Sequence, residues 1–113
     1  MLHKSCAAAD SLLKEGLSVE IIDPRTLVPF DFDTIQASIK KTGRLVIATE
    51  DILTCGVGSE IAAHVCENTF SYLKAPIVRV SAFPSPIPFA MACEADVIPS
   101  QADIEKAVRK VTN

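Results

Sequence analysis

The sequence has 113 residues, which is the length of one domain, so we expect a single domain over residues 1–113. Apolar residues make up 49% of the chain, enough for a core, but no apolar run approaches the roughly 20 residues that a membrane span requires. The formal net charge is −3 and the charges are dispersed, which argues against a nucleic-acid partner because such a surface normally carries a basic stripe.

A helix pattern begins at the amino terminus. Leu2, Cys6, Ala9 and Leu13 fall on one face, and the segment is rich in alanine, a strong helix former. In an α/β layer such a helix normally follows a strand, and no strand precedes it in this sequence. We therefore expect Met1 to be an internal methionine of a longer protein.

Three short apolar runs predict strands, at residues 19–22, 44–49 and 77–80. The second run is apolar on both faces, as is typical of a parallel strand covered by helices. The third run is interrupted by Arg79, which suits a position nearer the edge of a sheet.

Helix signals fill the intervals between these runs. Asp31 is the expected N-cap and Gly43 the expected C-cap of one helix. A longer helix is predicted over residues 59–73. Ser100 and Asp103 form a capping-box pattern before the last amphipathic segment.

The alternation of strands and helices predicts an α/β fold with right-handed crossovers and a mostly parallel sheet. The segment 81–99 contains Pro84, Pro86 and Pro88, which prevent regular strand pairing. We expect this segment to be a long loop that is functional or packed on a neighbour.

The loop Gly56-Val57-Gly58 precedes a helix, where backbone amides can hold an anion. The third glycine and the downstream acid of a dinucleotide site are missing. A tight turn that lets helix and strand pack closely is the competing interpretation.

Charged residues follow two of the predicted strands. Asp23, Arg25, Glu50 and Asp51 lie at the strand ends where open α/β sheets bind ligands. A receiver-type phosphorylation site would also need a lysine after a later strand, and none follows Val80. We expect these residues to cap loops and to pair with each other or with another chain.

Two further groups of side chains belong to types that can bind metal ions or act as nucleophiles. His64 and Cys66 are two apart on a helix and do not face each other, so a solvated or interface histidine is favoured over a shared metal. Cys55 precedes a helix N-terminus, where a thiolate is stabilised, but no histidine is adjacent in sequence. With Cys6 and Cys93, these cysteines lack a C-x-x-C pair, and we expect four reduced thiols rather than a disulfide framework.

Taken together, these residues resemble the carboxy-terminal domain of transketolase-type enzymes, and specifically the beta subunit of thiamine diphosphate-dependent 2-oxoacid dehydrogenases. The resemblance covers roughly residues 2–111. Cys55 stands where that family usually has glycine. The matching positions are Val19, Ile22, Asp23, Arg25, Thr26, Leu27, Pro29, Asp31, Lys41, Thr42, Gly43, Arg44, Glu50, Thr54, Gly56, Gly58, Glu60, Ala75, Pro76, Arg79, Val80, Pro86, Pro88 and Phe89.

The resemblance implies a three-layer α/β/α domain with a mostly parallel sheet from which a central strand, upstream of Met1, is missing. It implies no catalytic, cofactor or metal residue in this chain, because thiamine diphosphate and magnesium belong to other parts of the parent enzyme. Glu50, Gly56, Gly58 and Glu60 carry over only as a structural and interface loop.

The resemblance also implies the partners, which are an alpha subunit and a second beta subunit of an α2β2 assembly, and a lipoyl acyltransferase core. We expect a cytoplasmic location, or the mitochondrial matrix or a plastid if a transit peptide lies upstream. Two hypotheses follow. The chain is an assembly domain that is inactive alone, or it is an independent α/β module that binds an anionic ligand at the Gly56–Gly58 loop.

Overall fold

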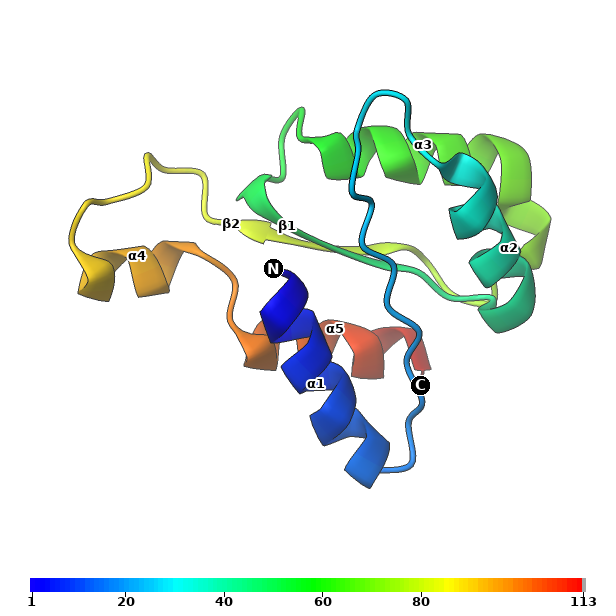
Figure 1. The fold of residues 1–113 in the computed structure, drawn as a ribbon, viewed down its shortest axis with the longest axis horizontal. Helices are drawn as coiled ribbons and strands as arrows, with labels where there is room; N and C mark the ends of the chain where they lie inside the picture. The colour runs from blue at the N-terminus through cyan, green and yellow to red at the C-terminus, as the bar shows by residue number, and fades with distance from the viewer. Residues whose placement is uncertain (113) are drawn as a thin grey trace.

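The computed structural model describes residues 1–112, which form helices around a small parallel sheet (Figure 1). The elements in chain order are α1 (Leu2–Lys14), α2 (Phe32–Thr42), β1 (Val46–Ile52), α3 (Val57–Thr69), the 3-10 helix η1 (Phe70–Tyr72), β2 (Val78–Ala82), α4 (Met91–Val97) and α5 (Gln101–Thr112). None of the helices within these residues has the length and apolar character needed to cross a membrane.

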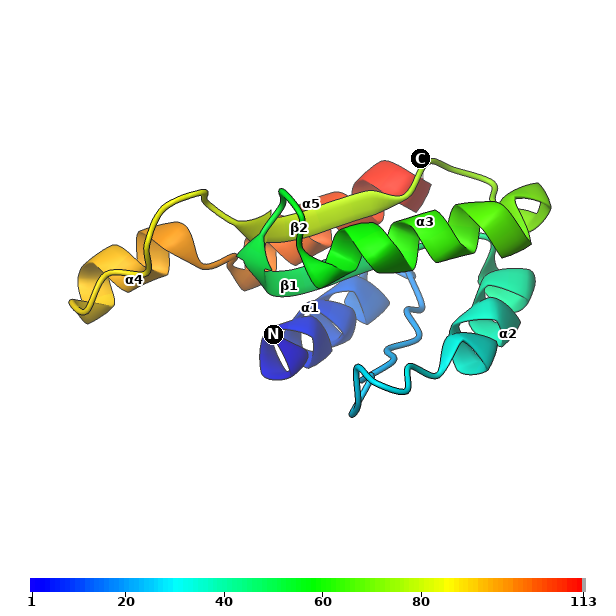
Figure 2. The ribbon, with the colours of Figure 1, turned by 90° about the horizontal axis from the view of Figure 1, so that it is seen from above.

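The elements form three layers. β1 and β2 pair in parallel, with Val46 opposite Val78 and Ala48 opposite Val80. α2 and α3 cover one face of the two strands, and α1 and α5 cover the other (Figures 1 and 2). The predicted α/β/α architecture with a parallel sheet is confirmed.

β1 contributes to a hydrophobic core on each face, because successive side chains of a strand point in opposite directions. Ile47 packs with buried residues of α2 and α3, among them Ile39 and Val65. Val46 and Ala48 pack on the opposite core, which α1 and α5 build. The double covering explains why β1 is apolar on both faces.

The predicted helix caps are confirmed. The Asp31 side chain accepts a hydrogen bond from the Thr34 amide at 3.0 Å, and Gly43 ends α2 in the left-handed region with φ +73°. At the start of α5, the Ser100 amide donates to Asp103 at 2.8 Å and the Asp103 amide donates to Ser100 Oγ at 3.3 Å. The long helix starts and ends slightly earlier than expected, at Val57–Thr69, and continues as η1.

The predicted strand at residues 19–22 is wrong. The segment lies outside regular structure, and β2 is the sole strand that pairs with β1 within residues 1–112. Val19 packs against the α1–α5 core and Ile22 against the α2–α3 core. The apolar pattern therefore reflects burial of side chains, while the backbone has no neighbouring strand with which to form a ladder.

The predicted apolar face of α1 is displaced by one position. The buried residues are Ala8 and Leu12, whereas Leu2, Cys6 and Leu13 are exposed. Ala8 and Leu12 contact α5, so the position of that helix selects the buried face.

The expectation of a loop throughout residues 81–99 is also wrong, because residues 91–97 form α4. The stretch between Pro88 and Pro99 is free of proline and contains Met, Ala and Glu, which favour helix. α4 projects from one end of the molecule (Figure 1).

Candidate functional site

The loop between β1 and α3 is organised by the carboxylate of Asp51. It accepts hydrogen bonds from Thr49 Oγ1 at 3.0 Å and from the Val57 amide at 3.1 Å. The first amide of α3 is therefore satisfied by the chain itself. Because an anion at this loop would compete with Asp51, the geometry weighs against the anion-binding interpretation.

The two glycines of the loop lie where a side chain would meet other atoms. A Cβ atom at position 56 would lie 2.5 Å from the carbonyl oxygen of Ile52, and one at position 58 would lie 3.3 Å from a methyl group of Ile47. Gly58 thus allows α3 to lie close to β1, as in the tight-turn interpretation.

Cys55 adopts the left-handed region of backbone conformation, with φ +58°. This region favours glycine, because a Cβ atom is disfavoured there. The Cys55 side chain is exposed and lies in the turn before α3.

Arg79 of β2 forms hydrogen bonds with this loop, and the sequence did not predict these contacts. Its guanidinium group donates to the carbonyl oxygen of Leu53 at 3.2 Å and to Ser59 Oγ at 2.5 Å. Arg79 lies opposite Ile47 in the register of the two strands, which aims its side chain toward α3. The sequence pointed to a role for Arg79 because Arg79 is among the positions that match the family. Which atoms its side chain contacts depends on the register of the two strands, and that register was not evident from the sequence.

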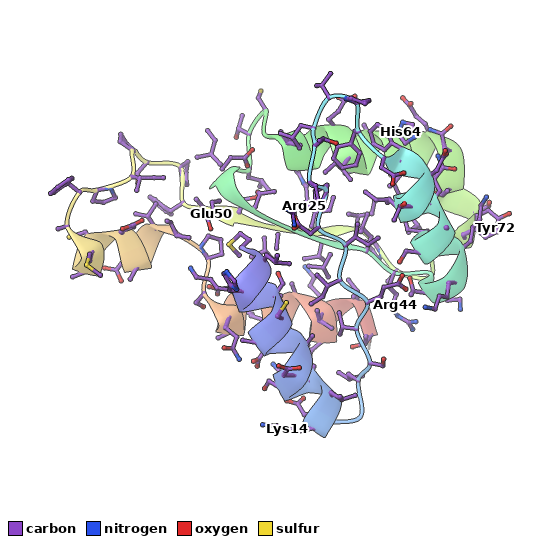
Figure 3. The ribbon with its side chains drawn as sticks, in the orientation of Figure 1. Lys14, Arg25, Arg44, Glu50, His64 and Tyr72 are labelled. Carbon is purple, nitrogen blue, oxygen red and sulfur yellow. The ribbon has the colours of Figure 1, made fainter. Side chains whose placement is uncertain are left out.

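The two glutamates of the candidate loop lie apart. Glu50, at the carboxyl end of β1, accepts a hydrogen bond from the amino-terminal ammonium group at 2.7 Å (Figure 3). That bond lowers the pKa of Glu50 from its usual value. Glu60 is exposed in the first turn of α3.

Asp23 and Arg25 pair with each other, as expected from their sequence positions. Their charged atoms lie 3.6 Å apart on an exposed stretch before α2. An ion pair of this kind contributes little to stability because water screens it.

His64 is half-buried and not fully solvated. Its ring stacks on Phe32 with centroids 3.6 Å apart, and its Nε2 atom lies 3.3 Å from Nε2 of Gln36. His64 therefore joins α3 to α2 within the chain. Cys66 is exposed, and residues 1–112 contain no cluster of three or more His, Cys, Asp or Glu side chains that could hold a metal ion.

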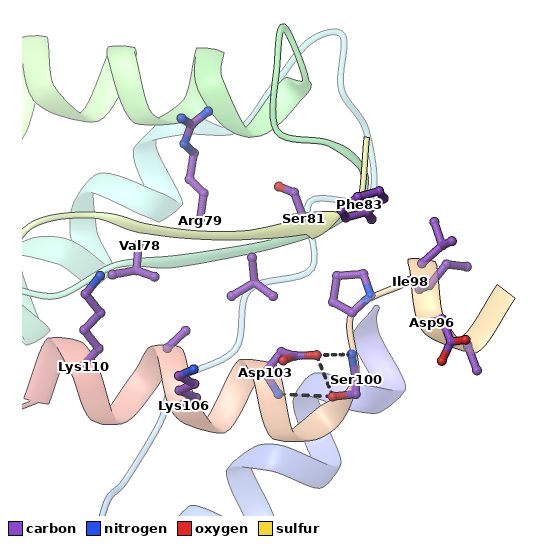
Figure 4. Close-up of a pocket in the computed structure, with 15 residues that line it drawn as sticks. Val78, Arg79, Ser81, Phe83, Asp96, Ile98, Ser100, Asp103, Lys106 and Lys110 are labelled. Atoms are coloured by element: carbon purple, nitrogen blue, oxygen red, sulfur yellow. Dashed lines mark hydrogen bonds between the residues drawn. The ribbon is translucent and has the colours of Figure 1, made fainter. Parts of the chain in front are cut away.

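A hollow of about 520 Å³ lies between β2 and α5 (Figure 4). Lys106 and Lys110 line it, and Asp103 is bound within it to the hydroxyl of Ser100 at 2.6 Å. Because the Asp103 carboxylate is committed to the helix cap, its function here is structural.

Comparison with known proteins gives consistent matches. Residues 1–104 match the family model described as transketolase, C-terminal domain. The chain is 43% identical over 110 residues to the acetoin:2,6-dichlorophenolindophenol oxidoreductase subunit beta of Cupriavidus necator, which covers 97% of this chain and 32% of that protein.

Two pyruvate dehydrogenase E1 component beta subunits are similarly related. That of Rickettsia felis is 46% identical over 104 residues, covering 92% of this chain and 32% of the relative. That of Bacillus subtilis is 39% identical over 111 residues, covering 98% of this chain and 34% of the relative. The chain therefore spans about a third of the length of the curated relatives that it matches. With its three-layer fold and its family match over most of its length, the chain belongs to the transketolase C-terminal domain family.

Proposed function

We propose that this chain is an assembly and partner-docking domain of the beta subunit of a 2-oxoacid dehydrogenase. The parent enzyme would decarboxylate pyruvate or a branched-chain 2-oxoacid and transfer the acyl group to lipoyl groups. The family match and the similarity to beta subunits of pyruvate dehydrogenase support this proposal. The partners would be an alpha subunit and a second beta subunit in an α2β2 assembly, and the lipoyl acyltransferase core. The proposed location is the cytoplasm, or the mitochondrial matrix or a plastid for a parent with a transit peptide.

The observation that carries the proposal is a run of exposed apolar side chains before and at the start of α4. Phe83, Ile87, Phe89 and Met91 are exposed, and Phe89 is fully so. We call residues 83–91 the apolar arm. Water around such clustered apolar surface is released when a partner covers it, so exposed patches of this kind mark protein interfaces.

The described residues do not fit a magnesium ion with a diphosphate group. Asp51, the acid nearest the α3 N-terminus, is engaged by Thr49 and by the Val57 amide. No cluster of three potential ligands lies within residues 1–112. Thiamine diphosphate and magnesium would therefore be held by other parts of the parent enzyme, and we assign no catalytic step to this chain.

Binding to an alpha subunit tests the docking role. The double variant F89D/M91D places two charges on the apolar arm and should weaken binding to a pyruvate dehydrogenase alpha subunit at least tenfold, measured by analytical ultracentrifugation. The matched control F70D alters an equally large exposed apolar residue on η1, outside the arm. Equal affinities for both variants, or no binding by the unaltered chain, would contradict the docking proposal.

Activity of the purified chain tests the second part of the proposal. With thiamine diphosphate, magnesium, pyruvate and 2,6-dichlorophenolindophenol present, we expect no reduction of the dye unless companion subunits are added. Turnover by this chain alone would overturn the proposal.

Calorimetry with inorganic phosphate distinguishes the assembly domain from the alternative hypothesis. Phosphate binding at millimolar concentration that is lost in G56A would favour an independent anion-binding module.

A further inference from the structure

The edge of β2 that faces away from β1 carries backbone groups that point into the hollow beside α5. The Val78 amide donates to the carbonyl oxygen of Leu45 at 3.2 Å, so the backbone groups of Val78, and of Val80 two residues on, face β1. In a parallel pair, alternate residues of a strand direct their N–H and C=O groups to opposite neighbours. Arg79 and Ser81 therefore direct theirs away from β1, and both residues line the hollow.

The next residue in this series shows that the outer edge can accept an extended chain. The Phe83 amide donates to the carbonyl oxygen of Val97 at 3.0 Å, so the stretch after α4 pairs with the end of this edge. The pairing cannot extend through Pro99, because proline has no N–H, and the chain then enters α5. The backbone groups of Arg79 and Ser81 are thus left beside the open hollow of about 520 Å³ (Figure 4).

Two lysines of α5 flank this part of the edge. Lys106 and Lys110 line the hollow and are exposed, and Lys110 extends toward Val78 (Figure 4). Residues four apart lie on the same side of a helix, separated by about 6 Å along its axis. Alternate side chains of a strand point to the same face and lie about 6.6 Å apart. A strand beside β2 can therefore place two side chains, two residues apart, against the two lysines.

The charges within the hollow favour an acidic occupant. Of its acidic residues, Asp103 is hydrogen-bonded to Ser100 in the cap of α5, and Asp96 lies at the far end near Ile98 (Figure 4). The lysines lie nearer the beginning of β2 than Asp96 does (Figure 4). Two carboxylates of a bound segment would meet opposite charges there.

A second copy of this chain matches the edge less well. If two β2 edges paired about a two-fold axis, the α5 helices beside them would also meet. Lys106 and Lys110 of both copies would then lie at one interface, where their like charges repel. The hydrogen bond between Phe83 and Val97 also occupies the end of each edge, which shortens the stretch that two copies could pair.

We propose that this edge of β2 is a docking site for one short extended segment of another protein, which adds to the sheet beside β2 and carries two acidic side chains two residues apart. The backbone of the segment pairs with Arg79 and Ser81, and its carboxylates contact Lys106 and Lys110. This docking does not depend on the proposed function of the parent enzyme.

The experiment titrates the full chain with the peptide acetyl-Val-Glu-Val-Glu-Val-amide and follows the backbone amides by NMR. We expect saturable binding, and hydrogen exchange of the Arg79 and Ser81 amides at least tenfold slower in the complex. The amides of Val78 and Val80 already face β1, so their exchange should slow less. The matched peptide with glutamine in place of both glutamates should bind at least threefold more weakly, because only the charges differ.

Charge reversal on the protein supplies the complementary test. The variant K106E/K110E should bind the glutamate peptide at least tenfold more weakly, and should instead bind acetyl-Val-Lys-Val-Lys-Val-amide. Both lysines are exposed, so the fold should stay intact, as circular dichroism would show. The matched control K14E/K40E makes the same change of net charge at exposed lysines that do not line the hollow, and should bind the glutamate peptide as the unaltered chain does.

Several results would overturn the proposal. They are the absence of peptide binding, equal binding of the glutamate and glutamine peptides, equal loss of binding in the two double variants, or unchanged exchange at Arg79 and Ser81. A stable dimer that the glutamate peptide fails to dissociate would show that a second copy covers this edge instead.

Discussion

Cys55 carries a local backbone penalty, because a residue with a Cβ atom is disfavoured at its φ of +58°. Glycine relieves that penalty but loses more conformational entropy on folding, so the net gain from C55G is about 0.5–1 kcal/mol. We expect C55G to raise the melting temperature in a thermal unfolding experiment. C55A is the control, since it removes the thiol and keeps the Cβ atom. An equal rise in C55A would show that the thiol, and not the backbone, is responsible.

The two glycines of the β1–α3 loop should respond differently to alanine. At Gly56 the new Cβ would lie 2.5 Å from a backbone oxygen that cannot rotate away, so G56A should destabilise the chain by about 1–3 kcal/mol. At Gly58 the contact is 3.3 Å from a side-chain methyl group, and alanine also improves helix propensity by about 1 kcal/mol. Urea denaturation should therefore find G58A close to the unaltered chain. The reverse order would contradict the packing described for this loop.

At the scale of an element, α5 depends on its cap. Ser100 and Asp103 satisfy each other's amides, and α5 supplies buried residues to the core that it shares with α1. We expect S100A to lower the free energy of unfolding by about 1 kcal/mol, measured by urea denaturation. S71A, at an exposed serine of η1, should change it by less than about 0.5 kcal/mol. An equal loss in the two variants would argue against the cap.

At the scale of the whole molecule, five carboxyl groups have pKa values below their usual range: Glu15, Asp31, Glu50, Asp103 and Glu105. In each the largest cause is a side-chain or ammonium hydrogen bond to the ionised form, as from Arg109 to Glu15 and from Ser100 to Asp103. The folded state therefore binds fewer protons than the unfolded state below the ordinary values of 3.8 for Asp and 4.5 for Glu. The contribution of these groups is fully present above those values and is lost as pH falls through the lowered ones.

We accordingly expect the melting temperature to fall steadily as the pH is lowered from about 5 to about 3, measured by circular dichroism. D103N removes one of the titrating groups and should flatten the decrease. A melting temperature that stays constant over this range would contradict the assigned carboxylate hydrogen bonds.

Local signals predicted the elements whose causes are local. Asp31, Gly43 and the Ser100–Asp103 pair act through neighbours within four residues, and each cap lies where the sequence indicates. β1 was predicted from its apolar character on both faces. Side chains whose environment depends on distant elements were predicted less well, as His64 shows, because its contact with Phe32 requires α2 to lie beside α3.

The sequence by itself determined the alternation of helices with parallel strands and the family to which the chain belongs, because both depend on residue types at fixed spacings. Only the tertiary structure decided that residues 19–22 form no strand, that Ala8 and Leu12 are the buried residues of α1, and that Arg79 holds the loop before α3. These outcomes depend on which segments lie side by side in space. A strand needs a paired neighbour, and a buried face needs a surface to cover it, and neither requirement can be met by the residues of one segment alone.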